Sequence, residues 1–135
     1  MRKFISAILC ISILGLLAGC SAEKMSTEKL RDIDFTVVDE ENIPEELEDM
    51  IDDREKEMFK LTYADNGALY IAVGYGEQKT SGYSIEVKEL YETENAIYIH
   101  TNLIGPSNDE KIVERRTYPY IVVKLEFIDK NVVFE

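Results

Sequence analysis

Apolar and polar residues alternate along most of the second half of the chain, and this period of two constrains the fold more than any other feature. Alternation of this kind predicts β-strands with one buried face. It recurs after residue 58 in six segments: 59–63, 69–75, 83–87, 97–101, 121–127 and 132–134. Asp65-Asn66-Gly67 separates the first two segments and is typical of a hairpin turn. Because the connections are mostly short, we expect antiparallel pairing.

Two further elements are expected before these strands. Ile33, Phe35 and Val37 alternate with polar residues and predict a first strand. Pro44 followed by two glutamates predicts a helix start, since proline suits the first turn and acidic side chains complement the positive end of the helix dipole. The face of this helix would comprise Leu47, Met50, Ile51, Arg54 and Met58, so the helix is expected to end near Met58. The predicted fold is α+β: mainly antiparallel β, with about seven strands in a sandwich or open barrel and one N-terminal amphipathic helix.

The first 20 residues have the layout of a secretory signal. Arg2 and Lys3 precede an apolar segment that runs from Phe4 to about Leu17, and small residues follow it. Leu17-Ala18-Gly19-Cys20 resembles the bacterial lipobox, in which the chain is cut between Gly19 and Cys20 and the cysteine sulfur receives a diacylglyceryl group. The two palmitate-type acyl chains on this one cysteine would provide the two signals that stable anchoring requires. The expected location is therefore the extracytoplasmic face of a cell membrane, in a bacterial lipoprotein.

Two other readings of this segment remain open. A plain secretory signal could be cut after Ala22, because Cys20-Ser21-Ala22 also ends in small residues. A retained anchor is the second, although roughly 14 apolar residues fall short of the ~20 that cross a bilayer. We expect residues 1–19 to be a signal peptide, residues 20–31 a lipidated N-terminus and flexible tether, and residues 32–135 a single β-rich domain.

The charge and the cysteine count exclude several classes of function. Without residues 1–19, 13 basic and 27 acidic residues remain, a net charge of −14. Such a chain repels phosphate backbones, so we expect no nucleic-acid partner. Cys20 would be the one cysteine left, which excludes a disulfide within the domain and a thiolate zinc site.

Three segments between residues 69 and 126 resemble the C-terminal domain of the PrcB proteins, which are named for a lipoprotein subunit of a spirochaete surface protease complex. The matching segments are Ile71-Ala72-Val73-Gly74, then Thr80-Ser81-Gly82-Tyr83-Ser84-Ile85-Glu86-Val87, and then Pro106 with Tyr118-Pro119-Tyr120-Ile121-Val122-Val123-Lys124. The chain has Lys79 where the family pattern commonly has proline and Ser81 where glycine is usual. The resemblance implies a non-catalytic subunit that stabilises or docks a surface or secreted protease.

The glycine-rich loop from Gly74 to Gly82 is the main candidate for a contact surface. Its glycines indicate turns or a close backbone approach, and tyrosine is common at protein interfaces. The residues expected to contact a partner are Tyr75, Gly76, Thr80, Gly82, Tyr83 and Tyr118. A cell-wall or small-ligand binding module would use the same tyrosines as stacking surfaces, and a pocket lined by them would distinguish it.

Catalytic chemistry has little support in the sequence. His100 is the one histidine of the chain, and neither a nucleophile-elbow motif nor a calcium-binding loop is present. A hydrolase, the least favoured alternative, would need His100 within hydrogen-bond reach of a serine or an acidic residue. We therefore expect no enzyme activity, no cofactor and no dedicated metal site. Loose calcium binding by the acidic helix or by Asn108-Asp109-Glu110 is left open.

Overall fold

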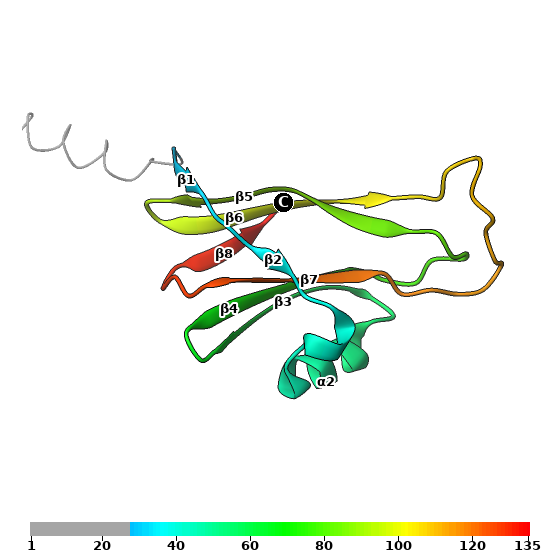
Figure 1. The fold of residues 1–135 in the computed structure, drawn as a ribbon, viewed down its shortest axis with the longest axis horizontal. Coiled ribbons are helices and arrows are strands. Elements are labelled where there is room, and N and C mark those ends of the chain that lie inside the picture. The colour runs from blue at the N-terminus through cyan, green and yellow to red at the C-terminus, as the bar shows by residue number, and fades with distance from the viewer. Residues whose placement is uncertain (1–27) are drawn as a thin grey trace, which may run out of the picture.

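A computed structural model describes residues 28–135, and these residues form a two-sheet sandwich with one helix packed outside it (Figure 1). Sheet A has the strand order β1-β5-β6-β8 and sheet B the order β2-β7-β4-β3. The strands are β1 (Lys29–Asp32), β2 (Thr36–Val37), β3 (Met58–Asp65), β4 (Ala68–Tyr75), β5 (Ser84–Thr93), β6 (Ala96–Ile104), β7 (Tyr120–Glu126) and β8 (Asn131–Phe134). The helical elements are a 3₁₀ turn (Glu40–Asn42) and α2 (Glu45–Arg54). The mainly antiparallel α+β fold with one α-helix is confirmed for these residues, and it is a sandwich rather than a closed barrel.

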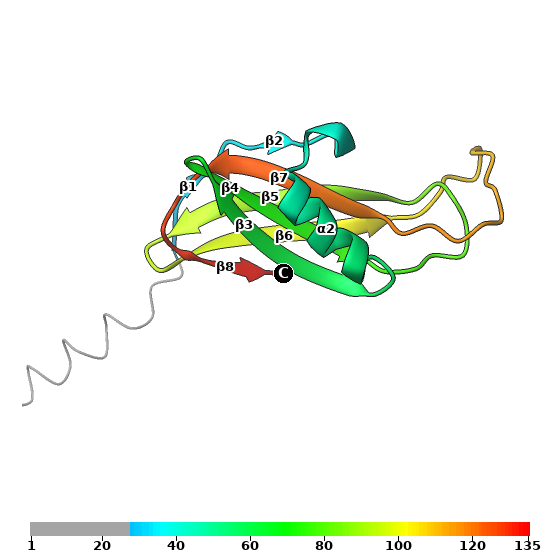
Figure 2. The same cartoon turned by 90° about the horizontal axis from the view of Figure 1, so that it is seen from below.

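The main core lies between the two sheets. It contains Ile71 and Val73 from β4, Val123 from β7, and Ile97 and Ile99 from β6. A second cluster lies on the other face of sheet B, where Leu47 and Ile51 of α2 pack on β3, β4 and β7. All but the last residue of β4 are buried, because β4 has apolar neighbours on both faces. The layers are therefore sheet A, sheet B and α2, as Figures 1 and 2 show.

Local sequence determines the two hairpins. Asn66 and Gly67 both have positive φ, +49° and +78°, as a two-residue type I′ turn requires. The β5–β6 turn is stabilised by the buried Thr93, whose hydroxyl accepts the Ala96 N–H at 3.1 Å and donates to the Ala96 carbonyl. A bulge between Val87 and Glu89 shifts the alternation of β5, so that Leu90 instead of Glu89 enters the core.

The expected strand at 33–37 is wrong in its extent. The Ile33 N–H donates to the Leu90 carbonyl in sheet A at 2.9 Å, whereas Thr36 already pairs with Lys124 in sheet B. The chain thus changes sheets across Asp34 and Phe35, and buried Ile33 stays between the layers. Strand β1 begins at Lys29, inside the segment expected to be a tether.

The helix is shorter than predicted. It ends at Arg54, and the Glu57 N–H bonds to the Arg54 carbonyl as the chain turns back. Met58 is the first residue of β3, pairs with Tyr75 and is 66% exposed, so it does not belong to the helix face. Met58 instead extends the ladder with β4, because its exposed side chain contributes no burial that would favour a further turn of α2, whose buried residues are Leu47 and Ile51.

Strand β8 also departs from the expected antiparallel pairing. The short connection after β7 crosses to the other sheet, and β8 pairs parallel with β6, from Ala96↔Asn131 to Ile99↔Phe134. Val132 and Phe134 pack against the main core from this position. Their burial accounts for the sheet change.

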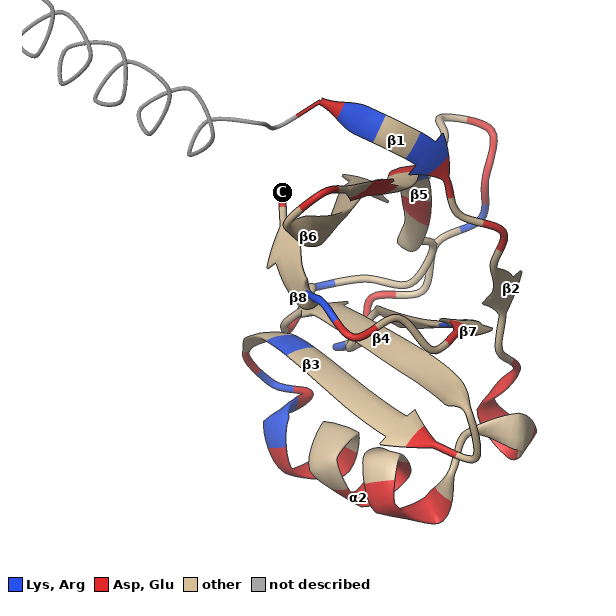
Figure 3. Ribbon diagram, turned by 90° about the vertical axis from the view of Figure 1, so that its left-hand side faces the viewer, with Lys and Arg blue, Asp and Glu red and all other residues tan. Residues whose placement is uncertain are grey.

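The acidic excess is concentrated on the helical side of the molecule. Residues 39–57 contain eleven acidic and two basic side chains, and Figure 3 shows the acidic residues crowding α2 and the 3₁₀ turn. The Tyr63 hydroxyl donates to the Glu46 carboxylate at 2.7 Å, which links α2 to β3. This bond is the main reason that the pKa of Tyr63 is raised to about 12.

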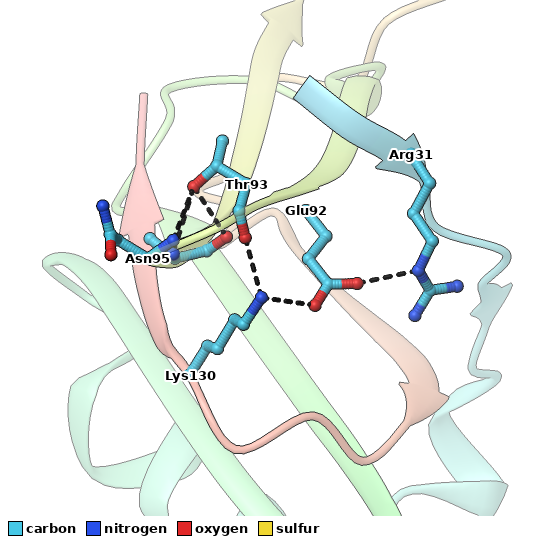
Figure 4. Close-up of polar contacts among 6 residues, drawn as sticks. Arg31, Glu92, Thr93, Asn95 and Lys130 are labelled. Carbon is cyan, nitrogen blue, oxygen red and sulfur yellow. Dashed lines mark hydrogen bonds and ion pairs between the residues drawn. The ribbon is translucent and has the colours of Figure 1, made fainter. Parts of the chain in front are cut away.

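A polar cluster connects the start of the described chain to the sandwich (Figure 4). The Glu92 carboxylate accepts one bond from Lys130 and one from Arg31 of β1, each at 2.7 Å. Lys130 also donates to the Thr93 carbonyl at 2.8 Å. The cluster thus joins β1, β5 and the β7–β8 connection beside the β5–β6 turn.

Candidate contact surface at one end of the sandwich

Two long connections meet at the end of the sandwich opposite the β5–β6 turn. One runs from β4 to β5 (residues 76–83) and the other from β6 to β7 (residues 105–119); together they are called the two-loop end here (Figure 1). Lys29 pairs with Thr93 near the β5–β6 turn, whereas Ser84 and Ile104 pair beside the two loops. Because β5 has ten residues, the described chain begins about 30 Å from the two-loop end.

Hydrogen bonds join the two loops along their length. Gln78 and Thr117 exchange backbone bonds of 2.8 and 3.0 Å. The Thr117 hydroxyl donates to the Thr80 carbonyl at 2.7 Å. Ser81 donates its N–H to the Val113 carbonyl, and its hydroxyl oxygen accepts the Val113 N–H at 2.8 Å. These bonds hold the loops as one surface, and the side chain of Ser81 makes a contact that glycine could not.

The glycines of the first loop allow close packing. Gly76 has φ +76°, and a Cβ there would lie 3.2 Å from the backbone of Glu57 and Met58. Gly82 has φ +93°, and a Cβ there would overlap the Glu110 carboxylate and lie 2.7 Å from Cβ of Pro106. Both glycines therefore have structural roles in this conformation.

The predicted tyrosines have different environments. Tyr83 is half-buried with its ring over Gly105, where a Cβ would lie 3.6 Å from Cε1 of Tyr83. Tyr118 is half-buried and donates to the Glu77 carboxylate at 3.3 Å; desolvation and the Glu77 charge raise its pKa. Tyr75 is directed between the sheets, with its hydroxyl 2.7 Å from Oγ1 of Thr101. The structure thus brings Thr80, Gly82, Tyr83 and Tyr118 together on the two-loop end, whereas the Tyr75 hydroxyl points into the sandwich.

The tyrosines line separate hollows. Tyr118 and Tyr120 border a groove of about 340 Å³ beside Val38. Tyr75 borders a cleft of about 240 Å³ between β3 and β8. No stacking pocket shared by Tyr75 and Tyr118 appears among these hollows of the described chain.

Sequence reasoning missed three exposed apolar side chains, one at the end of β6 and two in the second loop of the two-loop end. Ile104, Ile112 and Val113 are 42%, 47% and 56% exposed. Residues 76–83 and 105–119 together contain four acidic and four basic residues, so this end lacks the acidic excess of α2. An Ile-Val pair inside an otherwise polar connection is the sequence signal that could have indicated this surface.

His100 lies on the outer face of sheet A, paired with Glu89 across the ladder. In residues 28–135, His100 forms no hydrogen bond with a serine or an acidic side chain. Across the same part of the chain, no three acidic, histidine or cysteine side chains gather as metal ligands. Cys20 and Gly19, the predicted lipidation and cleavage positions, lie outside the described residues. No helix in the described region is long and apolar enough to span a membrane.

Residues 69–126 match the sequence family described as PrcB C-terminal. This segment belongs to the PrcB C-terminal domain family. The matched segment runs from β4 to β7 and therefore includes both loops of the two-loop end. Strands β1 to β3, α2 and β8 lie outside it. No curated protein and no solved structure is significantly similar to the chain.

Proposed function

We propose that the protein is a lipid-anchored, extracytoplasmic binding module that uses the two-loop end to contact another protein. The proposed partner is a secreted or surface protease or its complex. This protein would act as a non-catalytic subunit that stabilises or docks the protease. The two-loop end is the main support for the proposal. It combines loops joined by hydrogen bonds, tyrosines and exposed apolar side chains within the PrcB C-terminal segment.

The position of the two-loop end supports this role. The described chain begins at the opposite end of the sandwich, and the Glu92 cluster fixes β1 there. Anchoring through Cys20 would direct the two loops away from the membrane. A partner at the cell surface could then reach them without displacing the anchor.

The hydrogen bonds between the loops favour recognition by a largely preformed surface. A preorganised surface loses less conformational entropy on binding than a free loop of the same composition. Tyr83 and Tyr118 provide large contact areas with few rotatable bonds.

Site-specific photo-crosslinking on intact cells tests the contact surface. A crosslinking residue at Ile112 or Tyr83 should capture the same protein, whereas the same residue at Asp49 of α2 or Tyr91 of sheet A should not. Tyr83→Ala and Tyr118→Ala should reduce capture from position 112, with Tyr91→Ala as the matched control. Equal capture from all four positions, or capture that Tyr83→Ala and Tyr118→Ala leave unchanged, would contradict the proposal.

The anchor is tested separately by the intact mass of the protein extracted from membranes. We expect a mature chain that begins at Cys20 and carries added acyl mass, and its loss in Cys20→Ser. An unmodified thiol at position 20 would disprove the anchor and leave the contact surface to be judged by crosslinking.

A further inference from the structure

Helix α2 leaves part of the outer face of sheet B uncovered. Figure 2 shows α2 lying over the sheet while the end at the β3–β4 hairpin extends beyond it. There Ala68, Tyr70, Lys124 and Glu126 form the floor of a groove of about 670 Å³. Asp34, Phe35 and Thr36 border one side and the hairpin residues Asp65, Asn66 and Gly67 the other. This volume lies in the range of ordinary binding sites.

The sheet change after β1 opens this groove. Strand β2 pairs with β7 only at Lys124 and Val123, because the preceding residues cross toward sheet A. The Val38 N–H bonds to the Val122 carbonyl on the β2 side, and the Phe127 N–H bonds to the Gly67 carbonyl on the β4 side. By the alternation of the ladder, the N–H and C=O of Glu126 face the open β2 side. Within residues 28–135, this edge of β7 has no strand partner at Glu126.

The groove combines negative charge with an exposed aromatic ring. Asp34, Asp65 and Glu126 form no ion pair in the described part of the chain. Asp65 accepts one long hydrogen bond from Asn66, at 3.5 Å. Phe35 is 38% exposed at the rim.

The one basic residue of the lining does not neutralise these carboxylates. The Lys124 ammonium lies 5.7 Å from the centre of the Tyr70 ring, over the floor. A second hollow of about 250 Å³ shares Thr36, Tyr70 and Lys124 and continues the groove to Asp39. The groove thus extends toward the acidic 3₁₀ turn.

We propose that this groove binds an extended, basic segment of a partner protein. The segment would pair with the open edge of β7 at Glu126 and place arginine or lysine side chains among Asp34, Asp65 and Glu126. Its apolar side chains would pack against Phe35. Charge complementarity selects this occupant, and the surrounding acidic surface would attract it from a distance.

The groove is independent of the proposed contact at the two-loop end. It lies at the β3–β4 hairpin, at the same end of the sandwich as the β5–β6 turn (Figure 1), and shares no residue with the two loops. Crosslinking from position 112 and peptide binding in the groove can therefore succeed or fail separately.

The test is fluorescence polarisation with the purified protein and a labelled hexapeptide of alternating arginine and valine. A peptide with glutamate in place of arginine is the charge control.

Asp34→Asn/Asp65→Asn/Glu126→Gln should weaken binding about tenfold or more, since three ion pairs are lost together. The matched control Glu45→Gln/Asp49→Asn/Asp53→Asn changes the net charge equally on the outer face of α2 and should weaken binding less than about twofold. Phe35→Ala should weaken binding about threefold, and circular dichroism with thermal melting checks that each variant is folded.

Three outcomes would overturn the proposal. The first is absence of binding to the folded wild-type protein at about 1 mM peptide. The second is equal weakening by the two triple variants, which would identify a general electrostatic field rather than a groove. The third is tighter binding of spermine than of the peptide with the same sensitivity to the groove variants, which would identify a polyamine site.

Discussion

The hydroxyl oxygens of Tyr75 and Thr101 lie 2.7 Å apart, and this hydrogen bond joins β4 of sheet B to β6 of sheet A. Thr101 is buried, and Tyr75 packs against the main core. The bond satisfies two polar groups in an apolar environment at the edge where the sandwich opens between β3 and β8.

Tyr75→Phe should therefore destabilise the protein by about 0.5–2 kcal/mol, because the buried Thr101 hydroxyl loses its partner. Tyr75→Phe/Thr101→Val should cost less than the sum of the two single variants, as measured by urea unfolding. Strictly additive costs would show that the two hydroxyls do not interact. Crosslinking from position 112 should be unaffected by Tyr75→Phe, in contrast to Tyr83→Ala.

Gly74 packs directly on the ring of Phe59 across the β3–β4 ladder. A Cβ at position 74 would overlap the ring, which is itself buried beneath α2. Gly74→Ala should cost about 1–3 kcal/mol of unfolding free energy, and Phe59→Leu in the same chain should recover part of that loss. Gly67→Ala is the matched control, because a Cβ at position 67 would meet open space. It should lower the unfolding free energy by about 1 kcal/mol through its positive φ alone, and Phe59→Leu should not recover that loss.

Leu47 and Met58 were expected on one helical face, but the structure separates them. Leu47 is fully buried between α2 and sheet B, whereas Met58 begins β3 in solvent. Leu47→Ala should destabilise the protein by about 2–5 kcal/mol, and Met58→Ala should change its stability by less than about 0.5 kcal/mol. Chemical denaturation of both variants measures this, and similar losses would support the longer helix.

The Glu92 cluster predicts a pH-dependent contribution to stability. The hydrogen bonds from Lys130 and then from Arg31 lower the pKa of Glu92 below its ordinary value of 4.5. The charged form therefore stabilises the fold above about pH 4.5, and this contribution is lost as the pH falls through the lower folded-state value. Glu92→Gln should be less stable than wild type at pH 7, and this difference should shrink as the pH is lowered toward 2.5, as followed by urea unfolding.

The control for this prediction is Glu94→Gln in the adjacent turn, where the side chain is exposed. It should match wild type at both pH values. A deficit of Glu92→Gln that persists unchanged at pH 2.5 would mean that the carboxylate charge is not the cause.

Part of the candidate site could be predicted because local residue types determine it. Glycines in the 74–82 loop indicated unusual backbone, and Gly76 and Gly82 do have positive φ. The pairing of this loop with residues 113–117 was not predictable, since it joins segments more than thirty residues apart through bonds such as Val113 N–H to Ser81 Oγ. The groove beside Phe35 was also missed. It depends on residues 34 and 35 crossing between the two sheets next to the end of β7, and the local sequence does not show this crossing.

The amino-acid sequence by itself determined the six strands after residue 58, the hairpin at Asn66-Gly67 and the helix start after Pro44. Alternation, positive φ and proline geometry are properties of neighbouring residues, so they can be read locally. The tertiary structure alone decided that β1 and β2 lie in different sheets, that β8 pairs parallel with β6, and that the bulge after Val87 brings Leu90 inside. These choices depend on which distant apolar faces are buried together, and a strand's own pattern specifies a buried face without specifying its neighbour.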